Sequence, residues 1–262
     1  LTNKSEKAQN HSPKQVMAAI YWIYYMSVLA NINYLEWESD FFSLNTGRLE
    51  FSAQAPVLTQ DRLEQFTVVH AKVASYDLLL IDNLTQLGFQ FAEGEIDFKL
   101  PIGTENACEN IAEIHFRTAN ETDIPLLMTT ASAAFVQSRF RAPWYQEGDS
   151  SRFYALWVKK AVLGTFDDSC LLTMDRENKV TGFVTLRRIS ESEARVGLLA
   201  VMPNRTGQGI GKQLMSVAKY WCQQQGLSTL YVATQISNIA ASRLYTQSGA
   251  LIDSTTYWLY RG

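Results

Sequence analysis

The chain has 262 residues, of which 47% are hydrophobic and 12% aromatic, so it can bury one large core or two ordinary ones. A formal net charge of −3, without a long block of like charge, argues against a general nucleic-acid-binding protein. Three widely spaced cysteines indicate reduced thiols in a cytoplasmic protein, and the three histidines lack metal-ligand spacing, so we expect neither a disulfide framework nor a metal.

The first notable segment is the apolar stretch 16–32, which follows three lysines. It resembles a signal peptide or a short anchor. However, it is shorter than the ~20 residues that a membrane-spanning helix needs, and no small-x-small cleavage site follows it. We favour a surface-packed helix or a piece outside the ancestral domain. We therefore assign residues 1–33 to an apolar N-terminal extension, expect no stable membrane insertion, and expect residues 1–25 to be dispensable.

Residues 34–110 have the pattern of a smaller N-terminal α/β domain. The helix predicted near its end stops at Gly88, a residue typical of helix C-termini. Polar residues 103–110 are expected to form a linker. In chain order, the expected elements are a strand, turn and strand over 34–51, a helix over 57–74, a buried strand over 76–82, and a short helix followed by a strand over 83–101.

Residues 111–262 have the pattern of a second, larger α/β domain with a mixed sheet. Thr122 and Asp123 are candidate helix caps, and Pro125 fits the first helical turn. The expected elements are a strand and a helix within 111–135, a helix over 153–164, strands over 170–175, 180–188 and 194–201, a helix over 211–225, a strand over 228–234, a helix over 238–249 and a strand over 255–260.

A glycine-rich segment follows the strand over 194–201, with glycines at the alternate positions 207, 209 and 211. Its spacing fits neither the P-loop G-x-x-x-x-G-K-[ST] nor the dinucleotide fingerprint G-x-G-x-x-G. Successive backbone N–H groups at a helix N-terminus can nevertheless bind a pyrophosphate without a metal. The alternative is a glycine-rich turn into a helix that binds no ligand.

The segment 199-LAVMPNRTGQGIGKQL-214 resembles the acyl-CoA-binding motif of the GNAT superfamily of N-acetyltransferases, [RQ]-x-x-G-x-[GA] after a strand. Thr206 stands at the basic or amide position, which is a departure from that motif. The superfamily's second signature is an Asn at the start of the next helix and a Tyr seven residues later, and Asn238 and Tyr245 match it. Seven residues are almost two helical turns, so both side chains should lie on one face.

This resemblance implies an α/β GNAT acyltransferase fold for residues 111–262, with strands 194–201 and 228–234 parallel and separating at the acyl-CoA site. It also implies acetyl-CoA as co-substrate, with no metal. The backbone amide of Leu199 would stabilise the thioester oxygen, and Tyr245 would be the general acid for the leaving thiolate. The expected cofactor-binding residues are Leu199, Val201, Thr206, Gly207, Gly209, Gly211, Lys212 and Asn238.

The strings 131-ASAAFVQSRFRAPWY-145 and 231-YVATQISNIAASRLYTQSGA-250 are similar to a narrower group within this superfamily. The similarity runs from about residue 34 to residue 262. That group acetylates the 4-amino group of dTDP-4-amino-4,6-dideoxygalactose in enterobacterial common antigen biosynthesis. The resemblance therefore implies a nucleotide-sugar partner, and it is also the basis for expecting a homodimer.

Such a substrate carries a diphosphate and a thymine. Arg139 and Arg141 are candidates for binding the diphosphate, and Trp144 and Tyr145 for stacking on the base. The alternatives are surface arginines and buried aromatic residues without a ligand. No carboxylate stands out in the sequence as the base for the amine. Another amino-sugar nucleotide, a protein N-terminus, and a non-catalytic acyl-CoA-binding role remain alternative functions.

Overall fold

The structure is a computed structural model that describes residues 27–103, 111–135 and 138–262. Its strands are β1 (Ala30–Tyr34), β2 (Thr46–Phe51), β3 (Val68–Ala74), β4 (Gln90–Pro101), β5 (Phe116–Thr118), β6 (Ser169–Met174), β7 (Val180–Arg188), β8 (Glu193–Val201), β9 (Thr229–Gln235) and β10 (Leu251–Arg261). Its α-helices are α2 (Glu36–Phe42), α3 (Gln60–Leu63), α4 (Leu78–Gln86), α5 (Ile124–Ala134), α6 (Asp149–Val162), α7 (Ile210–Gln224) and α8 (Ile239–Gln247). Short 3-10 helices are η1 (Ile111–Glu113), η2 (Glu121–Asp123) and η3 (Pro203–Arg205).

The described strands form one sheet in the order β1-β2-β3-β10-β4-β9-β8-β7-β6-β5. The pairs β2–β3 and β8–β9 are parallel, and the other neighbouring pairs are antiparallel. The predicted mixed α/β sheet is therefore confirmed.

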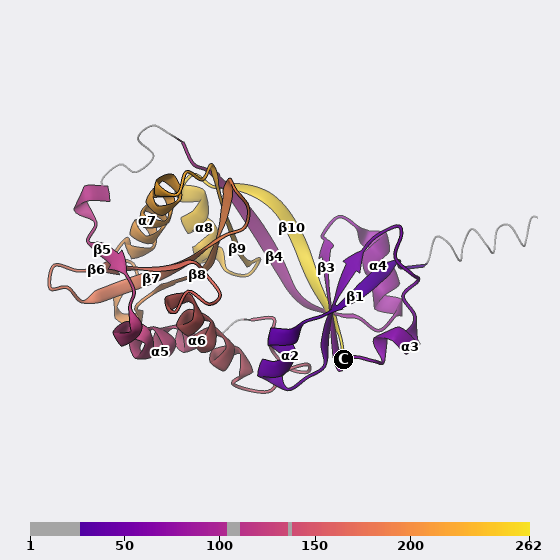
Figure 1. Ribbon diagram of the computed structural model, residues 1–262. Helices are drawn as coiled ribbons and strands as arrows, with labels where there is room; N and C mark the ends of the chain where they lie inside the picture. Colours follow the sequence, from indigo (N-terminus) through magenta and orange to yellow (C-terminus); the bar gives the residue numbers. More distant parts are fainter. Residues whose placement is uncertain (1–26, 104–110, 136–137) are drawn as a thin grey trace, which may run out of the picture.

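Strand β10 joins the two halves of the sheet. It pairs with β3 on one side, over residues 256–261, and with β4 on the other, over residues 251–260. Figure 1 shows β4 and β10 crossing together from the larger lobe to the smaller one. The predicted division between residues 34–110 and 111–262 is thus crossed by one continuous sheet, and the two-domain description remains a prediction.

Helices cover both faces of the sheet in the larger lobe (Figure 1). On one face, Leu214, Val217 and Ala218 of α7 are buried at the three- and four-residue spacing of an amphipathic helix. On the other, Phe153 and Val158 of α6 are buried in a separate cluster, into which α2 and α5 also pack. The sheet is therefore sandwiched, and a gap between two of its strands can be reached by side chains from both layers.

Most predicted elements of the larger lobe are present with boundaries shifted by a few residues. Pro125 lies in the first turn of α5, as expected. The predicted cap is in part wrong, because Asn120 caps this region: its side chain accepts from the Thr122 N–H at 3.0 Å. Asp123 completes a reciprocal capping box by accepting from the Asn120 N–H at 2.9 Å.

Three predictions for the smaller lobe are wrong. Residues 36–42 form helix α2 where a strand was predicted, and residues 68–74 form β3 where a helix was predicted. Strand β3 is central and buried on both faces, so its apolar residues do not alternate and mimic helical spacing. The run predicted as a buried strand instead begins α4, because the Asp77 side chain accepts from the Leu80 N–H at 3.2 Å and caps a helix.

The extension predicted over residues 1–33 lies largely outside the described residues, and so does the linker predicted over 103–110. Residues 30–33 do belong to the structure, where they form most of β1 and pair with β2. The sheet therefore begins before residue 34. Within the described residues, no helix combines the length and the apolar character that crossing a bilayer requires.

Candidate active site

Strands β8 and β9 separate soon after they begin. They pair only over residues 193–195 and 229–231, and beyond this point each continues without the other. The predicted separation of these two parallel strands is therefore confirmed. Among the described residues, it leaves one edge of β8 without a strand partner next to the glycine-rich segment.

The free edge of β8 presents backbone donors to this opening. The N–H of Met202 donates to the Thr181 carbonyl at 2.9 Å, and the N–H of Leu198 donates to the Thr185 hydroxyl at 2.8 Å. Both bonds run toward β7. Because successive N–H groups of a strand point in opposite directions, those of Leu199 and Val201 point into the opening.

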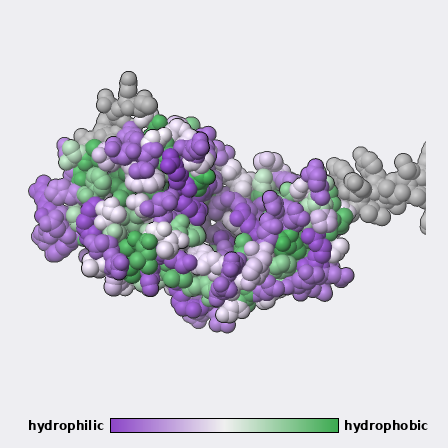
Figure 2. Space-filling view, viewed as in Figure 1, coloured by the Kyte–Doolittle hydropathy of each residue, from purple (hydrophilic) through white to green (hydrophobic). Residues whose placement is uncertain are grey.

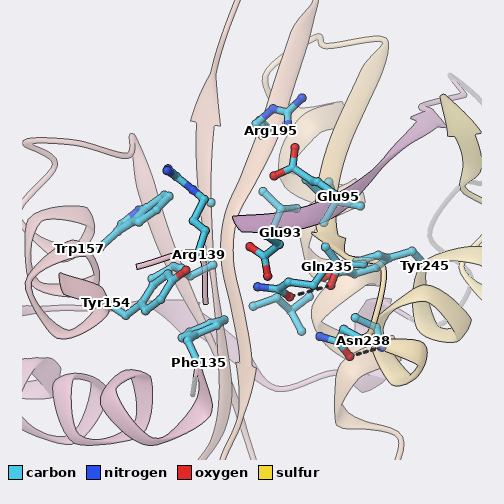
Figure 3. Close-up of a pocket in the computed structure, with 18 of the residues that line it drawn as sticks. Glu93, Glu95, Phe135, Arg139, Tyr154, Trp157, Arg195, Gln235, Asn238 and Tyr245 are labelled. Atoms are coloured by element: carbon cyan, nitrogen blue, oxygen red, sulfur yellow. Dashed lines mark hydrogen bonds between the residues drawn. The ribbon is translucent and has the colours of Figure 1, made fainter. Parts of the chain in front are cut away.

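A cavity of about 400 Å³ lies at this opening (Figure 3). Both layers of helices and both lobes of the sheet contribute to its walls, because side chains of α6, α8, β4 and β10 meet there. Trp157 of α6 is held in place by a buried carboxylate, since its Nε1 donates to Asp167 Oδ2 at 2.8 Å. The residues that carry the argument below are Glu93, Arg139, Leu199, Asn238, Tyr245 and Trp258, all of which line this cavity.

Helix α8 brings Asn238 and Tyr245 to the same cavity, as the seven-residue spacing predicts. The Asn238 side chain accepts from the Ala241 N–H at 3.1 Å and begins the helix. Tyr245 is only 5% exposed and packs edge-on against Phe98, with ring centroids 5.5 Å apart. Burial raises the pKa of the Tyr245 phenol, so it is protonated at neutral pH and available as a hydrogen-bond donor.

Glu93 of β4 is the carboxylate that sequence reasoning did not find. Figure 3 shows it in the middle of the cavity, between Arg139 on one side and Tyr245 on the other. Burial raises the pKa of Glu93 to about 7, an effect that Arg139 opposes and the neighbouring Glu95 reinforces. A carboxylate with such a pKa can accept a proton near neutral pH.

The two acidic residues that follow on the same face of β4 already have partners. Glu95 lies 2.6 Å from Lys72 Nζ and accepts from Trp258 Nε1 at 3.1 Å. Although burial opposes it, this pairing with Lys72 holds the pKa of Glu95 below its usual value. Asp97 accepts from Arg195 at 3.0 Å. Glu93, Glu95 and Asp97 alternate along the strand, and that alternation was the available sequence signal for a polar strand face.

The arginines and aromatic residues predicted to contact the substrate lie in different places. Arg139 lines the cavity, lies over Trp258 with its guanidinium carbon 4.2 Å from the ring centroid, and donates to the Tyr260 hydroxyl. Arg141 instead donates to the backbone carbonyls of Phe91 and Ala92, at 3.2 and 3.1 Å.

Neither Trp144 nor Tyr145 is among the residues that line the cavity. The Trp144 ring packs edge-on against Tyr260. Tyr145 is 4% exposed, and its hydroxyl hydrogen-bonds to His70 Nε2 at 2.7 Å. The structure therefore brings Arg139 to the site and does not bring Arg141, Trp144 or Tyr145 into its lining.

The glycine-rich segment connects the end of β8 to α7. Gly207 and Gly209 have φ angles of 76° and 78°, in the left-handed region that favours glycine. A Cβ at either position would meet no atom within 4 Å, so the backbone conformation, and not crowding, requires these glycines. Arg205 holds the start of the loop through an ion pair with Asp175 at 2.6 Å.

Gly211 has a different reason to be glycine. It lies in the first turn of α7, and a Cβ there would come within 3.0 Å of Leu244 Cδ2 on α8. Its small size therefore lets two helices pack closely. Thr206 and Lys212 are both exposed, on the loop and at the start of α7. Their predicted cofactor contacts, and that of Gly211, remain predictions.

Comparisons with known proteins agree with this geometry. The model of the acetyltransferase (GNAT) family matches residues 133–250. The chain is 45% identical over 236 residues to a dTDP-fucosamine acetyltransferase of Escherichia coli O6:H1, an alignment that covers 90% of this chain and 100% of that protein.

Solved structures are similar in fold at low sequence identity. A GCN5-related N-acetyltransferase from Kribbella flavida superimposes with a TM-score of 0.57 and 12% identity, covering 97% of this chain and 96% of that one. Another from Sphaerobacter thermophilus has a TM-score of 0.53 and 15% identity, covering 77% of this chain and 63% of that one. Together with the extended identity to a curated acetyltransferase, these findings show that the chain belongs to the GNAT family of acetyltransferases and is an acyltransferase.

Proposed function

We propose that the protein transfers the acetyl group of acetyl-CoA directly to the 4-amino group of dTDP-4-amino-4,6-dideoxy-D-galactose, in enterobacterial common antigen biosynthesis. The proposed substrate is taken from the Escherichia coli dTDP-fucosamine acetyltransferase, whose whole length aligns with 90% of this chain. One structural observation carries the chemistry: Glu93 and Tyr245, a proton acceptor and a hydrogen-bond donor, line one cavity at the opening between β8 and β9.

Acetyl-CoA suits the residues around this opening. The N–H groups of Leu199 and Val201 face it, and they can bond to an extended amide-bearing chain as a neighbouring strand would. Gly207 and Gly209 expose loop backbone next to the N-terminus of α7, a position that favours a pyrophosphate. Asn238 lines the cavity together with Leu199 and Val201.

Glu93 prepares the nucleophile. An amino sugar arrives largely as an ammonium ion, which cannot attack until it loses a proton. The pKa of Glu93, raised to about 7 by burial, matches a general base at neutral pH. Glu93 accepts the ammonium proton, directly or through one water, before the neutral amine attacks. The nitrogen loses its second proton as the amide forms, and through solvent this proton replaces the one that Tyr245 gives to the sulfur. The carboxylate also attracts the ammonium ion before the reaction.

Leu199 and Tyr245 act on the thioester. The Leu199 N–H stabilises the carbonyl oxygen as it gains negative charge. Tyr245 donates its hydroxyl hydrogen to the departing sulfur as the C–S bond breaks. Burial raises the pKa of this phenol further above that of a thiol, so Tyr245 contributes first as a hydrogen-bond donor and gives up its proton only as the thiolate forms.

Three further parts of the proposal concern location, assembly and the N-terminal segment. The cytoplasm is the proposed location, because the described cysteines, Cys170 and Cys222, are buried and not joined by a disulfide. A homodimer is expected from the family resemblance, and sedimentation would test it. Deletion of residues 1–25 should leave a folded, active enzyme, and loss of activity would contradict that expectation.

The test is acetyl-CoA turnover with a panel of acceptors. We expect the 4-amino-4,6-dideoxygalactose nucleotide to be acetylated with the highest kcat/KM. A 3-amino nucleotide sugar and a peptide with a free N-terminus should be poor acceptors, because both move the amine relative to Glu93. If either of these two acceptors has a higher kcat/KM than the 4-amino-4,6-dideoxygalactose nucleotide, the proposed substrate is wrong. Acetyl-CoA binding without turnover of any acceptor would indicate a non-catalytic acyl-CoA-binding protein.

A further inference from the structure

Three cationic side chains surround one tryptophan at the edge of the cavity. The distances to the centroid of the Trp258 ring are 4.2 Å for Arg139 Cζ, 5.4 Å for Arg48 Cζ and 5.5 Å for Lys72 Nζ. Trp258 itself is 6% exposed and lines the cavity. Arg48 and Lys72 come from β2 and β3 of the smaller lobe, so this lobe contributes charge directly beside the reaction site.

Sheet register places these groups in a row on one face. Trp258 is paired with Glu93 in β4 on one side and with Lys72 in β3 on the other. Arg48 in β2 is paired with His70, which lies two residues from Lys72 and therefore on the same face of β3. Because neighbouring strands are ~4.8 Å apart, the row from β4 to β2 spans roughly 14 Å. Figure 2 shows the surface hollowed between the two lobes, where β4 and β10 cross.

The charges along this row change sign. Glu93 and Glu95 lie at the β4 end, next to the opening that faces Tyr245. Lys72 and Arg139 are partly neutralised, by Glu95 at 2.6 Å and by Glu38 at 3.9 Å. Arg48 is exposed, and among the described residues it forms no ion pair. It is therefore the cation of this group that is most available to a ligand.

A nucleotide amino sugar has the same polarity. Its amine carries a positive charge at carbon 4, and its diphosphate carries negative charge at carbon 1, on the opposite side of the sugar ring. If the amine lies at Glu93, the diphosphate extends past Trp258 toward β3 and β2. Guanidinium groups bind phosphate oxygens in a bidentate geometry.

We propose that Arg48 and Lys72 of the smaller lobe, together with Arg139, form the subsite for the diphosphate of the nucleotide sugar, grouped around the buried Trp258 ring. This inference rests on the proposed function, since it names the part of that substrate which the smaller lobe recognises. Arg48 is the specificity-determining residue of the subsite, and it acts on binding without taking part in the acetyl transfer.

The experiment compares Arg48→Ala with the wild-type protein in two measurements. The first is dTDP binding by calorimetry, which needs no catalysis, and we expect Kd to rise about 10- to 100-fold, as for a lost hydrogen-bonded charge. The second is the KM for the nucleotide sugar, which should rise by a similar factor while kcat and the KM for acetyl-CoA stay unchanged. Arg176→Ala removes an exposed arginine from the β6–β7 turn and serves as the matched control.

A methyl glycoside of the same amino sugar, which lacks the nucleotide, distinguishes a loss of diphosphate binding from structural damage in the variant. Wild type and Arg48→Ala should acetylate this truncated acceptor equally slowly, whereas structural damage would slow the variant further. Unchanged dTDP affinity and unchanged KM in Arg48→Ala would overturn the subsite. A further outcome is that the wild type acetylates no nucleotide sugar while Arg48→Ala still binds dTDP more weakly than the wild type does. That pair of results would support the subsite and overturn the proposed function.

Discussion

The two sides of the cavity are built in different ways. On the side of the strand opening, the backbone N–H groups of Leu199 and Val201 face the cavity, and the glycine loop follows directly after β8. On the β4 side they are charged and aromatic side chains, among them Glu93, Arg139 and Trp258.

The difference concerns what each side has to recognise. Backbone donors provide a fixed geometry that tolerates sequence change, which suits a co-substrate shared by a whole enzyme family. Side chains from distant segments can change one at a time, which suits an acceptor that differs between family members. The smaller lobe contributes only to the second side, through Arg48 of β2 and Lys72 of β3, which lie beside the crossing strand β10. The predictions that follow test this division of roles.

The largest effect is expected at Tyr245. Tyr245→Phe keeps the buried ring against Phe98 and removes one hydroxyl, so kcat should fall by about 10²–10⁴, the usual contribution of general acid catalysis. Acetyl-CoA affinity and Tm should change little, because the backbone donors remain. Tyr220→Phe, on the α7 face that packs against Phe116, is the control. A kcat within a few-fold of wild type would show that another group protonates the thiolate.

A smaller effect is expected at Glu93. Glu93→Gln removes the base but keeps its size, and kcat should fall by about 10²-fold, because solvent can still accept the proton from the amine. Exposed Glu50 offers a matched control in Glu50→Gln, which should be neutral. Full activity of Glu93→Gln at neutral pH would mean that water is the base in the wild type.

The pH dependence sharpens the assignment of Glu93. A base is active when it is deprotonated. The logarithm of kcat/KM for the nucleotide sugar should therefore rise by one per pH unit below about pH 7, the pKa of Glu93, and level off above it. The step at this pH should disappear in Glu93→Gln, while any step due to the amine itself remains. Identical profiles for the two proteins would assign the step to the substrate.

The smallest effects separate two glycines. Gly209→Ala forces an alanine to φ 78°, which costs about 1 kcal/mol and should raise the KM for acetyl-CoA about fivefold. Gly211→Ala lies in a helix, where the better propensity of alanine offsets the 3.0 Å contact with Leu244. The KM of Gly211→Ala for acetyl-CoA should therefore stay within about twofold of the wild-type value. The reverse order in acetyl-CoA titrations would assign the cofactor contact to Gly211.

The opening side could be predicted from the sequence because its signals are local. A strand, a glycine loop and a helix follow one another within residues 194–225, and Asn238 and Tyr245 share one short helix. Periodicity and spacing describe such neighbours well. The parallel pairing of β8 with β9 and the separation that follows agree with that prediction.

The β4 side could not be predicted in the same way, because its residues are far apart in the chain. Glu93, Arg139 and Trp258 meet only when β10 pairs with β4, and no local pattern specifies that pairing. Tyr145 was predicted to stack on the base, but it is buried outside the cavity lining, where its hydroxyl hydrogen-bonds to His70, 75 residues away in the chain. In the smaller lobe, β3 was predicted as a helix. Both of its faces are buried, so apolar and polar residues do not alternate along it.

The position of β10 has a consequence for how the protein is made. Strands β3 and β4 leave the ribosome long before the strand that pairs with both, because residues 102–250 are synthesised in between. During that time each presents an unpaired strand edge that can pair wrongly or aggregate. Trp258 arrives with β10, so the acceptor side of the cavity is completed late in synthesis. We therefore expect nascent chains to depend on chaperones, and truncations that remove β10 to reduce the yield of folded protein far more than changes at the β5 edge.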